Sequence, residues 1–504
     1  MNRPGNGKAT RPVKLNRLLA ASPEAKLQAG AASTEITGLA YDSRAVQPGF
    51  LFLALRGEKT NGALFAEDAI RRGAVAVLHD QDLRLPRGVA AIQVPDARLA
   101  LADLAAEFYA HPSRQLRVLG VTGTNGKTTT TFMIRDILQA AGQSCGLLGT
   151  VQYEYGGRRL AAGRTTPEAL DLQRMLAEAL HAGCQAMAME VSSQGLAAER
   201  LRGVRFAAAV FTNLSVDHLD FHHTMEAYFL AKKRLFDTIA TQGGAPAILN
   251  ADDPHGRQLA ADPALAGHVV TFGGDPAAQV RAVDIQLTET SSTFRVITPW
   301  GEAAIATGFA GRFNVYNALA AIATCGTLGV PLPVMAATLA AMPAVPGRME
   351  RIADPHGRHI FVDYAHTEDA LRNVLQTLRE NAPGHLLCVF GCGGNRDRGK
   401  RPRMGAAVAE YADLAIVTSD NPRHEEPQAI IDDILAGMDP AKPHLVEPDR
   451  AAAIATALRA ARAGDTILIA GKGHEPYQEI AGRMAHFDDR ETVRALLATI
   501  PPAT

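Results

Sequence analysis

The sequence predicts an α/β protein of three domains, in which a small leading α/β domain is followed by two larger domains built on parallel sheets. The chain has 504 residues, the length of about three ordinary domains. From residue 116 onward, short apolar runs alternate with helix-compatible stretches, a pattern typical of parallel strands covered on both faces. Proline-containing steps at His111-Pro112-Ser113 and at Met342 to Gly347 interrupt the chain. We therefore place the domains at residues 1–112, 113–344 and 345–504.

The expected strands are apolar runs, taken here in chain order. In the leading domain they cover residues 50–54 and 74–78. In the central domain they cover 118–121, 186–191, 207–211 and 247–249, and in the C-terminal domain 360–362, 386–390, 414–417 and 466–469. The stretches between them are rich in alanine, which favours helices.

The composition is that of an ordinary globular protein, with 47% hydrophobic and 20% charged residues. A net charge of -1 gives no broad basic field, which argues against nucleic acid or a membrane surface as partner. Residues 1–17 are polar and basic, so we expect a loose leading tail, and no apolar stretch approaches the roughly 18 residues of a membrane span. The 5 cysteines lack metal-ligand spacing and are expected to be reduced core thiols. We expect a soluble, cytoplasmic monomer.

A glycine-rich turn between an apolar run and a helix-compatible stretch occupies residues 116–130. Its two glycines let backbone N–H groups approach an anion, and the helix that follows adds the positive end of its dipole. Lys127 supplies a charge and Thr128 a hydroxyl that can bind magnesium. The general Walker A pattern would have glycine at Val121, so this is the shorter G-x-x-G-K-T form. We expect a cradle for the phosphates of ATP; the alternative is a glycine turn with an incidental lysine. The predicted contacts of this loop are Gly123, Thr124, Asn125, Gly126, Lys127, Thr128 and Thr129.

Polar side chains stand at the carboxyl ends of two further central strands, where ligands of open α/β sheets bind. Glu190 and Ser192 end one strand, and Asp217 and His218 follow the next. Carboxylate oxygens and imidazole nitrogens around a phosphate are suitable ligands for magnesium. For any one of them alone, a satisfied buried polar group is the alternative interpretation.

Together with the phosphate loop, these residues belong to an ordered set of motifs that spans nearly the whole chain. On this set the sequence resembles the Mur ligase family, the ATP-dependent amide ligases that build the peptidoglycan stem peptide. The matching motifs are Val121-Thr-Gly-Thr-Asn-Gly-Lys-Thr128, Met189-Glu-Val-Ser-Ser193, Phe211-Thr-Asn-Leu214, Asp217-His218-Leu219-Asp220, Ala231-Lys232, Gly311-Arg-Phe-Asn-Val-Tyr-Asn317, Asp363-Tyr-Ala-His366, Gly391-Cys-Gly-Gly394 and Ala470-Gly-Lys-Gly-His-Glu475.

The resemblance implies a P-loop ATPase-like central domain and a Rossmann-like C-terminal domain. It also implies chemistry in which ATP converts a carboxylate into an acyl phosphate that an amine then attacks. Within the family the sequence is similar to the members that add a diamino acid to the D-glutamate side carboxylate of UDP-N-acetylmuramoyl-L-alanyl-D-glutamate. Its small-molecule partners are then that precursor and meso-diaminopimelate, and its cofactors are ATP and Mg²⁺.

The resemblance assigns the catalytic and metal-binding roles. Lys127 contacts the β- and γ-phosphates, Thr128 and Glu190 hold one magnesium ion, and His218 helps to hold a second. Lys232 matches a lysine that the family carries as a carbamate (N6-carboxylysine), which can accept where an ammonium beside magnesium would be repelled. The alternative for Lys232 is a solvated surface pair with the adjacent lysine.

The resemblance also assigns residues to the two nucleotides. Ser43, in Asp42-Ser43-Arg44, is expected on the uridine side, although this tripeptide would equally serve a turn or helix cap. Asn314 and Asn317 are expected on the adenine side, with helix capping as the alternative. The remaining assignments are Thr165, Thr166, Ser192 and Arg200 to the muramoyl dipeptide, and Asp363 and His366 to the ATP ribose side.

The choice of amino acid is expected to depend on Asp420-Asn-Pro-Arg423, which resembles the motif of the diaminopimelate-adding subgroup. Diaminopimelate differs from lysine by a second carboxylate, which a planar guanidinium can bind with two hydrogen bonds. The alternative for Arg423 is a structural role in a proline turn, and a lysine-adding ligase would lack only this motif. The residues assigned to diaminopimelate are Arg396, Asp420, Asn421, Arg423, Gly471 and Glu475.

Three positions depart from the pattern expected of the family. Gln194 stands in place of a common histidine, Asn395 in place of an acidic residue, and Glu368 in place of a common proline. Two other functions stay open at this point. A folylpolyglutamate synthase would share the loop and the ligase chemistry but not the leading domain, and a nucleotide-dependent switch would hydrolyse ATP slowly to change its domain orientation.

Overall fold

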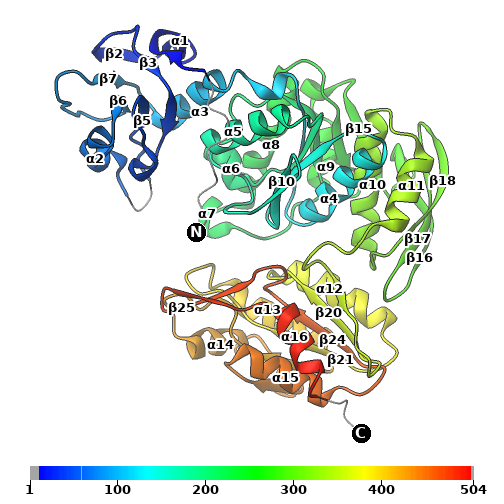
Figure 1. Cartoon of the computed structure of the whole chain (residues 1–504). Coiled ribbons are helices and arrows are strands. Elements are labelled where there is room, and N and C mark those ends of the chain that lie inside the picture. The colour runs from blue at the N-terminus through cyan, green and yellow to red at the C-terminus, as the bar shows by residue number, and fades with distance from the viewer. Residues whose placement is uncertain (1–10, 58–59, 501–504) are drawn as a thin grey trace. The chain divides into compact units, whose positions relative to one another are not determined.

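The computed structural model describes residues 11–57 and 60–500 (Figure 1). The chain divides into two compact units, one of residues 1–120, 143–208 and 241–245 and one of residues 121–142, 209–240 and 246–504. The predicted boundaries at residues 112 and 344 remain predictions.

The leading part contains a five-stranded sheet in the order β2-β7-β6-β5-β4, parallel except for β2. Residues alternate between the two faces of this sheet, as the two-residue period of a strand requires. Leu51 and Leu53 pack with Leu101 and other residues of α3 on one face, whereas Phe52 packs with Ala69 of α2 on the other. The elements are β1 (Val13–Lys14), α1 (Leu15–Ala20), β2 (Lys26–Ala29), β3 (Glu35–Ile36), β4 (Gly38–Ala40), η1 (Ser43–Ala45), β5 (Phe50–Leu53), η2 (Gly62–Phe65), α2 (Ala66–Arg71), β6 (Ala74–His79), β7 (Ala90–Gln93), α3 (Ala97–Phe108) and η3 (Pro112–Arg114).

The prediction of a loose tail over residues 1–17 is wrong for its second half. Val13 and Lys14 form strand β1, which pairs with β3, and Leu15 begins helix α1. Leu15 and Leu18 are both fully buried in the leading core. Residues 1–10 lie outside the described residues. The apolar residues at positions 13, 15 and 18 indicate an ordered segment, but the overall polarity of this stretch led to the prediction of a tail.

The central sheet has eleven strands in the order β11-β10-β9-β12-β8-β13-β14-β15-β16-β17-β18. The four central strands predicted from apolar runs are all present, as β8, β12, β13 and β14. β12 pairs in parallel with β9, and β14 in parallel with β13 and β15. The elements are β8 (Arg117–Thr122), α4 (Lys127–Ala140), β9 (Cys145–Leu148), β10 (Gln152–Tyr155), β11 (Arg158–Ala161), α5 (Ala169–His181), β12 (Ala186–Glu190), α6 (Ser193–Ala197), β13 (Phe206–Phe211), α7 (Leu219–His222), α8 (Met225–Thr241), β14 (Ala247–Asn250), α9 (Pro254–Ala260), η4 (Pro263–Leu265), β15 (Val269–Gly273), β16 (Val280–Leu287), β17 (Ser292–Thr298), β18 (Gly301–Thr307), α10 (Arg312–Thr327) and α11 (Leu332–Ala341).

Both ends of this sheet are antiparallel, which the sequence did not predict. β10 pairs with β9 and β11, and β17 pairs with β16 and β18, all in antiparallel register. In β17, buried and exposed positions alternate, because only one face of the strand is covered. A search for continuous apolar runs finds strands buried on both faces and misses such half-exposed strands.

The C-terminal sheet has six strands in the order β19-β20-β24-β21-β22-β23, and only β19 is antiparallel to its neighbour. Helices α12 to α14 cover one face, where Leu371 and Met404 pack with Cys388. Helices α15 and α16 cover the other face, where Leu458 and Val493 pack on the sheet. A parallel sheet with helices on both faces confirms the predicted fold of this part. The elements are β19 (Glu350–Ile352), β20 (His359–Asp363), α12 (Glu368–Asn381), β21 (Leu386–Phe390), α13 (Lys400–Tyr411), β22 (Leu414–Val417), α14 (Pro427–Leu435), β23 (His444–Val446), α15 (Arg450–Ala460), β24 (Thr466–Ala470), β25 (Tyr477–Ile480), β26 (Arg483–His486) and α16 (Asp489–Leu497).

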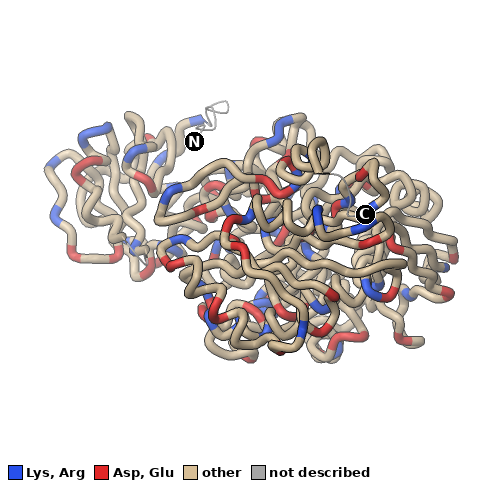
Figure 2. Tube along the Cα trace, turned by 90° about the horizontal axis from the view of Figure 1, so that it is seen from below, with Lys and Arg blue, Asp and Glu red and all other residues tan. Residues whose placement is uncertain are grey.

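Other features agree with the composition. All five cysteines are buried and free, as predicted. Acidic and basic residues are interleaved along the trace (Figure 2). Within residues 11–57 and 60–500, no helix is long and apolar enough to cross a membrane.

Candidate active site

The phosphate loop runs from the end of β8 at Thr122 to the start of α4 at Lys127. Gly123 and Gly126 both have positive φ angles, of 146° and 85°, that other residues rarely adopt. The loop is tied to the end of β13, because Thr124 N donates to Asn213 O at 2.8 Å and Asn125 N to Asn213 Oδ1 at 2.9 Å. This is the strand–loop–helix geometry that the G-x-x-G-K-T pattern predicts.

Gly126 offers a direct test of this loop, because a Cβ atom there would collide with Oδ1 of Asn317. Gly126→Ala is expected to weaken ADP binding at least tenfold, measured by calorimetry, since either the loop or Asn317 must shift. Gly142→Ala is the matched control: Gly142 follows the same helix with φ 77°, but nothing lies within 4 Å of its Cβ position. The control is expected to cost about 1 kcal/mol of stability and to leave ADP affinity unchanged. Equal ADP affinities for both variants would contradict the assignment of this loop.

Lys232 is buried on α8, with 1% of its surface exposed. Its Nζ donates to Gly123 O at 2.8 Å and lies 4.5 Å from the ring centroid of Tyr228. Burial, and then the charge of Lys127, lowers the pKa of Lys232 well below its ordinary value. The surface-pair alternative is therefore wrong for Lys232, whereas the adjacent Lys233 does pair at the surface, with Asp237 and Asp262. A buried lysine that is readily deprotonated is suited to carbamylation, because the neutral amine is the nucleophile for CO₂.

Lys127 is the first residue of α4, and its amino group folds back onto the phosphate loop. Its Nζ donates to Gly123 O at 2.9 Å and to Thr124 O at 2.8 Å. Lys127 and Lys232 therefore both bond the carbonyl oxygen of Gly123, which brings two amino groups to one end of the loop. Their mutual repulsion favours a neutral or modified Lys232.

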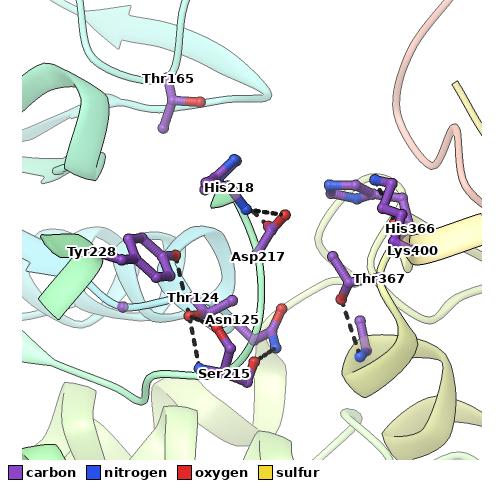
Figure 3. Close-up of polar contacts among 12 residues, drawn as sticks. Thr124, Asn125, Thr165, Ser215, Asp217, His218, Tyr228, His366, Thr367 and Lys400 are labelled. Atoms are coloured by element: carbon purple, nitrogen blue, oxygen red, sulfur yellow. Dashed lines mark hydrogen bonds and ion pairs between the residues drawn. The ribbon is translucent and has the colours of Figure 1, made fainter. Parts of the chain in front are cut away.

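Asp217 and His218 lie in the loop after β13 and point toward each other (Figure 3). His218 Nε2 is 3.5 Å from Asp217 Oδ2, and His218 adopts a left-handed φ of 55° at the start of α7. Burial lowers the pKa of His218 to about 4, against the opposing effect of Asp217. The imidazole is therefore neutral at ordinary pH, the form that can coordinate a metal ion. Burial would raise the pKa of Asp217, but His218, His366 and Lys400 together lower it.

Glu190 stands at the end of β12 in the first unit and is 1% exposed. Its two oxygens accept from the backbone N and the hydroxyl of Thr150, at 2.8 and 3.0 Å. The Thr150 hydroxyl also contacts the hydroxyl of Thr165 at 2.9 Å. Thr166 accepts from both the backbone N and the hydroxyl of Ser192 and donates to Glu190 O. The structure thus brings Glu190 together with Thr165, Thr166 and Ser192, and their assignment to magnesium and to the muramoyl dipeptide stays a prediction.

Arg200, in the same unit, is already paired within the protein. Its Nε lies 3.1 Å from Glu168 Oε1, and its Nη1 donates to Thr166 O at 3.3 Å. Burial lowers the pKa of Arg200, and Glu168 opposes this effect. A substrate carboxylate at Arg200 would share the guanidinium with Glu168.

In the leading part, the Asp42-Ser43-Arg44 segment forms the short helix η1. The Asp42 carboxylate accepts from Arg44 N at 3.0 Å and also pairs with its guanidinium, so the capping role applies to Asp42. Ser43 is 6% exposed, and its hydroxyl lowers the pKa of the Asp68 carboxyl. A uridine contact of Ser43 stays a prediction.

The two asparagines of α10 do not cap the helix, and Asn317 lies beside Gly126 of the phosphate loop. Gly311 is the N-cap residue, and Asn314 donates its side-chain N–H to Ala310 O at 2.8 Å. Asn317 donates to Asn314 Oδ1 at 3.0 Å and accepts from Thr130 Oγ1 at 3.4 Å. The capping alternative is wrong for both asparagines.

Asp363 ends β20, and both of its oxygens accept backbone hydrogen bonds, from Met349 N at 2.6 Å and from Ala365 N at 2.7 Å. Burial raises its pKa. His366 contacts Tyr364 O through Nδ1 at 2.7 Å and accepts from Lys400 Nζ through its own carbonyl at 3.0 Å. Asp363 therefore shapes the turn after β20 through the backbone, and a ribose contact stays a prediction.

Two loops of the C-terminal sheet bring together most of the residues assigned to the amino acid. Asn421 Nδ2 donates to Glu475 Oε2 at 2.9 Å, and the buried Lys472 Nζ lies within 3.3 Å of Asn421 Oδ1 and Glu475 Oε2. Gly471 has φ 114°, and a Cβ atom there would lie 2.6 Å from Asp420 Oδ2. Burial, and then Asp420, raises the pKa of Glu475, while Lys472 lowers it. The cluster is acidic overall and suited to an ammonium group.

The two arginines assigned to carboxylate binding flank Gly393. A Cβ atom at Gly393 would lie 2.9 Å from Nη1 of Arg423 and 3.9 Å from Cγ of Arg396. Arg423 follows Pro422 with φ 56°, donates to Gly394 O at 2.7 Å and lies 3.5 Å from Glu479. Arg423 thus also has the structural contacts of a turn residue, and substrate binding by either arginine stays a prediction.

Comparisons with known proteins identify the family. The leading residues 35–109 match the family model described as "Mur ligase family, catalytic domain", residues 121–325 match "Mur ligase middle domain", and residues 347–473 match "Mur ligase, glutamate ligase domain". A UDP-N-acetylmuramoyl-L-alanyl-D-glutamate–2,6-diaminopimelate ligase of Gloeobacter violaceus is 47% identical over 92% of this chain and 94% of its own length. The chain belongs to the Mur ligase family. A ligase of the same name from Synechococcus elongatus is 46% identical over 96% of this chain and 99% of its own length.

Solved structures show the same architecture. A UDP-N-acetylmuramoyl-L-alanyl-D-glutamate–2,6-diaminopimelate ligase matches with a TM-score of 0.67 and 35% identity, over 97% of this chain and 99% of its own. A folylpolyglutamate synthase of Mycobacterium tuberculosis matches with a TM-score of 0.62 but 18% identity, over 80% of this chain and 96% of its own. The second likeness shows the fold alone.

Two of the three departures from the Mur ligase pattern have a structural explanation. Asn395 has a left-handed φ of 51°, which asparagine tolerates, and its side chain accepts from His424 N at 3.1 Å. Its backbone N donates to Glu425, so an acidic side chain here would add a second negative charge beside that carboxylate. Glu368 is the first residue of α12, where a negative charge is favourable, and it pairs with Arg372. Nothing in the structure explains Gln194.

Sequence reasoning missed several residues of the site. Arg348 donates to Thr128 Oγ1 at 3.0 Å and stacks 4.6 Å from the ring centroid of Tyr364. It directly follows the Pro-Gly step that was interpreted only as a boundary. Thr150 follows β9 at the same sheet edge as Glu190, so the rule about carboxyl ends of strands could have found it. Lys472 lies inside the motif from Ala470 to Glu475, but the sequence gives no indication that its amino group contacts Asn421 and Glu475.

Proposed function

We propose that this Mur ligase adds meso-diaminopimelate to the D-glutamate side carboxylate of UDP-N-acetylmuramoyl-L-alanyl-D-glutamate, using ATP and forming ADP and phosphate. The observation that carries this proposal is the pairing of two features in the C-terminal part. Arg423 Nη1 lies beside Gly393, three residues before Arg396, and the acidic cluster around Glu475 suits an ammonium group. The names of the relatives that are 46–47% identical support the same substrate. We also propose that it works in the cytoplasm as a monomer, without membrane or nucleic-acid partners.

The chemistry proceeds in two steps. A carboxylate oxygen of the substrate attacks the γ-phosphorus of ATP, ADP leaves, and an acyl phosphate forms. The diaminopimelate amine then attacks the acyl carbon, the amine loses a proton, and phosphate leaves with the former carboxylate oxygen. Amide formation thereby avoids expulsion of an oxide ion, which is too poor a leaving group.

The chain's own residues would serve these steps by positioning and charge. Lys127 would bind the β- and γ-phosphates, and the backbone N–H groups of the loop would cradle them. Arg348, beside Thr128, would add a second positive charge at the phosphates. Together these groups offset the repulsion between a carboxylate and the triphosphate.

The proposed magnesium ligands are Thr128, Glu190, His218 and a carbamylated Lys232. Among the residues that the structure describes, no three His, Cys, Asp or Glu side chains gather as metal ligands, and the proposed set also includes the hydroxyl of Thr128 and the carbamate of Lys232. The neutral imidazole of His218 and the low pKa of Lys232 fit this donor set. Magnesium, when bound, would neutralise charge on the phosphates.

The test of ligase function is strict coupling between substrates. Purified protein with ATP and magnesium should release phosphate only when both the UDP-muramoyl dipeptide and meso-diaminopimelate are present, and mass spectrometry should show the tripeptide product. Phosphate release that is indifferent to every amino acid would instead support a nucleotide-dependent switch.

A further inference from the structure

A buried arginine lies directly behind the two loops of the amino-acid site. Arg450 is the first residue of α15 and is 1% exposed. Its Nη2 donates to Ala470 O at 2.9 Å, and its Nη1 donates to Ser419 O at 3.4 Å. Ala470 ends β24, and Ser419 lies two residues beyond β22. Because β21 lies between these strands, the guanidinium spans the carboxyl ends of three neighbouring strands.

Each of these two carbonyl groups immediately precedes a residue assigned to diaminopimelate. Gly471 follows Ala470, and Asp420 follows Ser419. The guanidinium thus holds both site loops at their first peptide units. Its charge also acts on the site: burial would lower the pKa of Arg450, but Asp489 and then Asp420 and Glu475 raise it.

Asp489 fixes the orientation of this guanidinium. It is the first residue of α16 and is fully buried. Its Oδ1 accepts from Nε of Arg450 at 2.7 Å and its Oδ2 from Nη2 at 2.8 Å. A bidentate pair of this kind holds the planar guanidinium in one orientation, so both Nη groups are directed at the strand ends.

The local position of Arg450 is unfavourable, which indicates a role beyond the helix. A positive charge in the first turn opposes the helix dipole, and a buried ion pair is by itself weak evidence for stability. What distinguishes the pair is which carbonyl groups it binds. The guanidinium of Arg450 donates to the carbonyl groups of Ser419 and Ala470, where the two site loops begin.

A second buried pair in the same sheet provides a comparison. Arg358 precedes β20, at the amino end of the sheet, and its Nε donates to Asp354 Oδ2 at 2.6 Å. It also donates to two carbonyl groups, those of Leu458 at 2.5 Å and Ile500 at 3.3 Å. Both side chains of this pair are fully buried, as are those of Arg450 and Asp489. The Arg358 pair therefore matches the Arg450 pair in burial and partners but contacts no loop of the site.

We propose that Arg450, oriented by Asp489, is a positioning residue that sets the spacing of the two loops that bind the incoming diamino acid. It contacts no reacting atom and acts through Gly471 and Asp420. This inference rests on the proposed function, because it assigns the two loops to diaminopimelate.

The experiment compares Arg450→Met with Arg358→Met in steady-state assays with all three substrates. Arg450→Met should raise the KM for meso-diaminopimelate about tenfold or more, since small displacements of binding groups carry large penalties. Its KM values for ATP and for the UDP-precursor should stay within about twofold of wild type. Arg358→Met should lower the melting temperature but leave all three KM values near wild type.

Two further variants make the outcome decisive. Asp489→Asn keeps the shape of the pair and Arg450→Lys keeps the charge, so both should fold, with intermediate KM values for diaminopimelate. The inference is overturned if Arg450→Met changes that KM no more than Arg358→Met does. If Arg450→Met does not fold, an unchanged KM in Asp489→Asn overturns it in the same way. A wild-type protein that makes no product with diaminopimelate contradicts the proposed function instead.

Discussion

Replacing Lys232 with alanine is expected to lower phosphate release by about 10³-fold or more. The variant loses the carbamate that we propose as a ligand of the phosphate-bound magnesium. Coupled phosphate release at saturating substrates measures the effect. Because a carbamate needs CO₂, wild-type activity should also fall in CO₂-depleted buffer and return when bicarbonate is added.

Lys233→Ala is the matched control for this prediction. Lys233 is the next residue of the same helix, but its side chain is 27% exposed and pairs with Asp237 and Asp262 at the surface. Its loss should leave turnover close to wild type, since surface ion pairs contribute about 1 kcal/mol or less. Near-normal turnover in Lys232→Ala would contradict the proposal that a carbamate on Lys232 binds magnesium.

Replacing Arg423 with alanine is expected to lower kcat/KM for meso-diaminopimelate by roughly 30-fold to several thousand-fold, which corresponds to about 2–5 kcal/mol for the loss of one partner of a buried charge pair. The use of L-lysine should not fall in parallel, because lysine lacks the second carboxylate. The preference for diaminopimelate over lysine should therefore shrink. Rates with each amino acid at limiting concentration measure this ratio.

Arg398→Ala controls for a general loss of positive charge near the site. Arg398 is 67% exposed and pairs with Asp433 at 3.1 Å. Its removal should leave the preference unchanged. Equal losses for diaminopimelate and lysine in Arg423→Ala would instead indicate that Arg423 holds the turn, through its bond to Gly394.

The sequence predicted central parallel strands such as β8 and β21, because strands buried on both faces are continuous apolar runs. It could not predict the antiparallel edges such as β17, where alternate positions face outward, or the helix α1 inside a polar leading stretch. Turn chemistry was more informative: Gly123 and Gly126 have the positive φ angles that the phosphate loop requires.

The sequence indicated some residues of the candidate site but not others, because it shows local motifs and does not show burial or long-range contacts. Residues inside contiguous motifs, such as Lys127 and Glu475, received proposed roles from the sequence alone, and these roles stay predictions. The burial of Lys232 could not, since the sequence shows it beside Lys233 on one helix. Arg348 and Arg450 were missed because their partners, Thr128 and Asp489, lie 220 and 39 residues away. Such long-range contacts depend on the fold, and no local sequence pattern predicts them.

The most direct test of the central claim is a competition between amino acids in one reaction. Purified protein receives ATP, magnesium, the UDP-muramoyl dipeptide and equal concentrations of meso-diaminopimelate, L-lysine and L-ornithine, and mass spectrometry identifies the products. We predict the diaminopimelate product in large excess, with phosphate released in equal amount. A predominant lysine product would contradict the assignment of Arg423 and Arg396 to a substrate carboxylate, and phosphate without any peptide product would contradict the ligase itself.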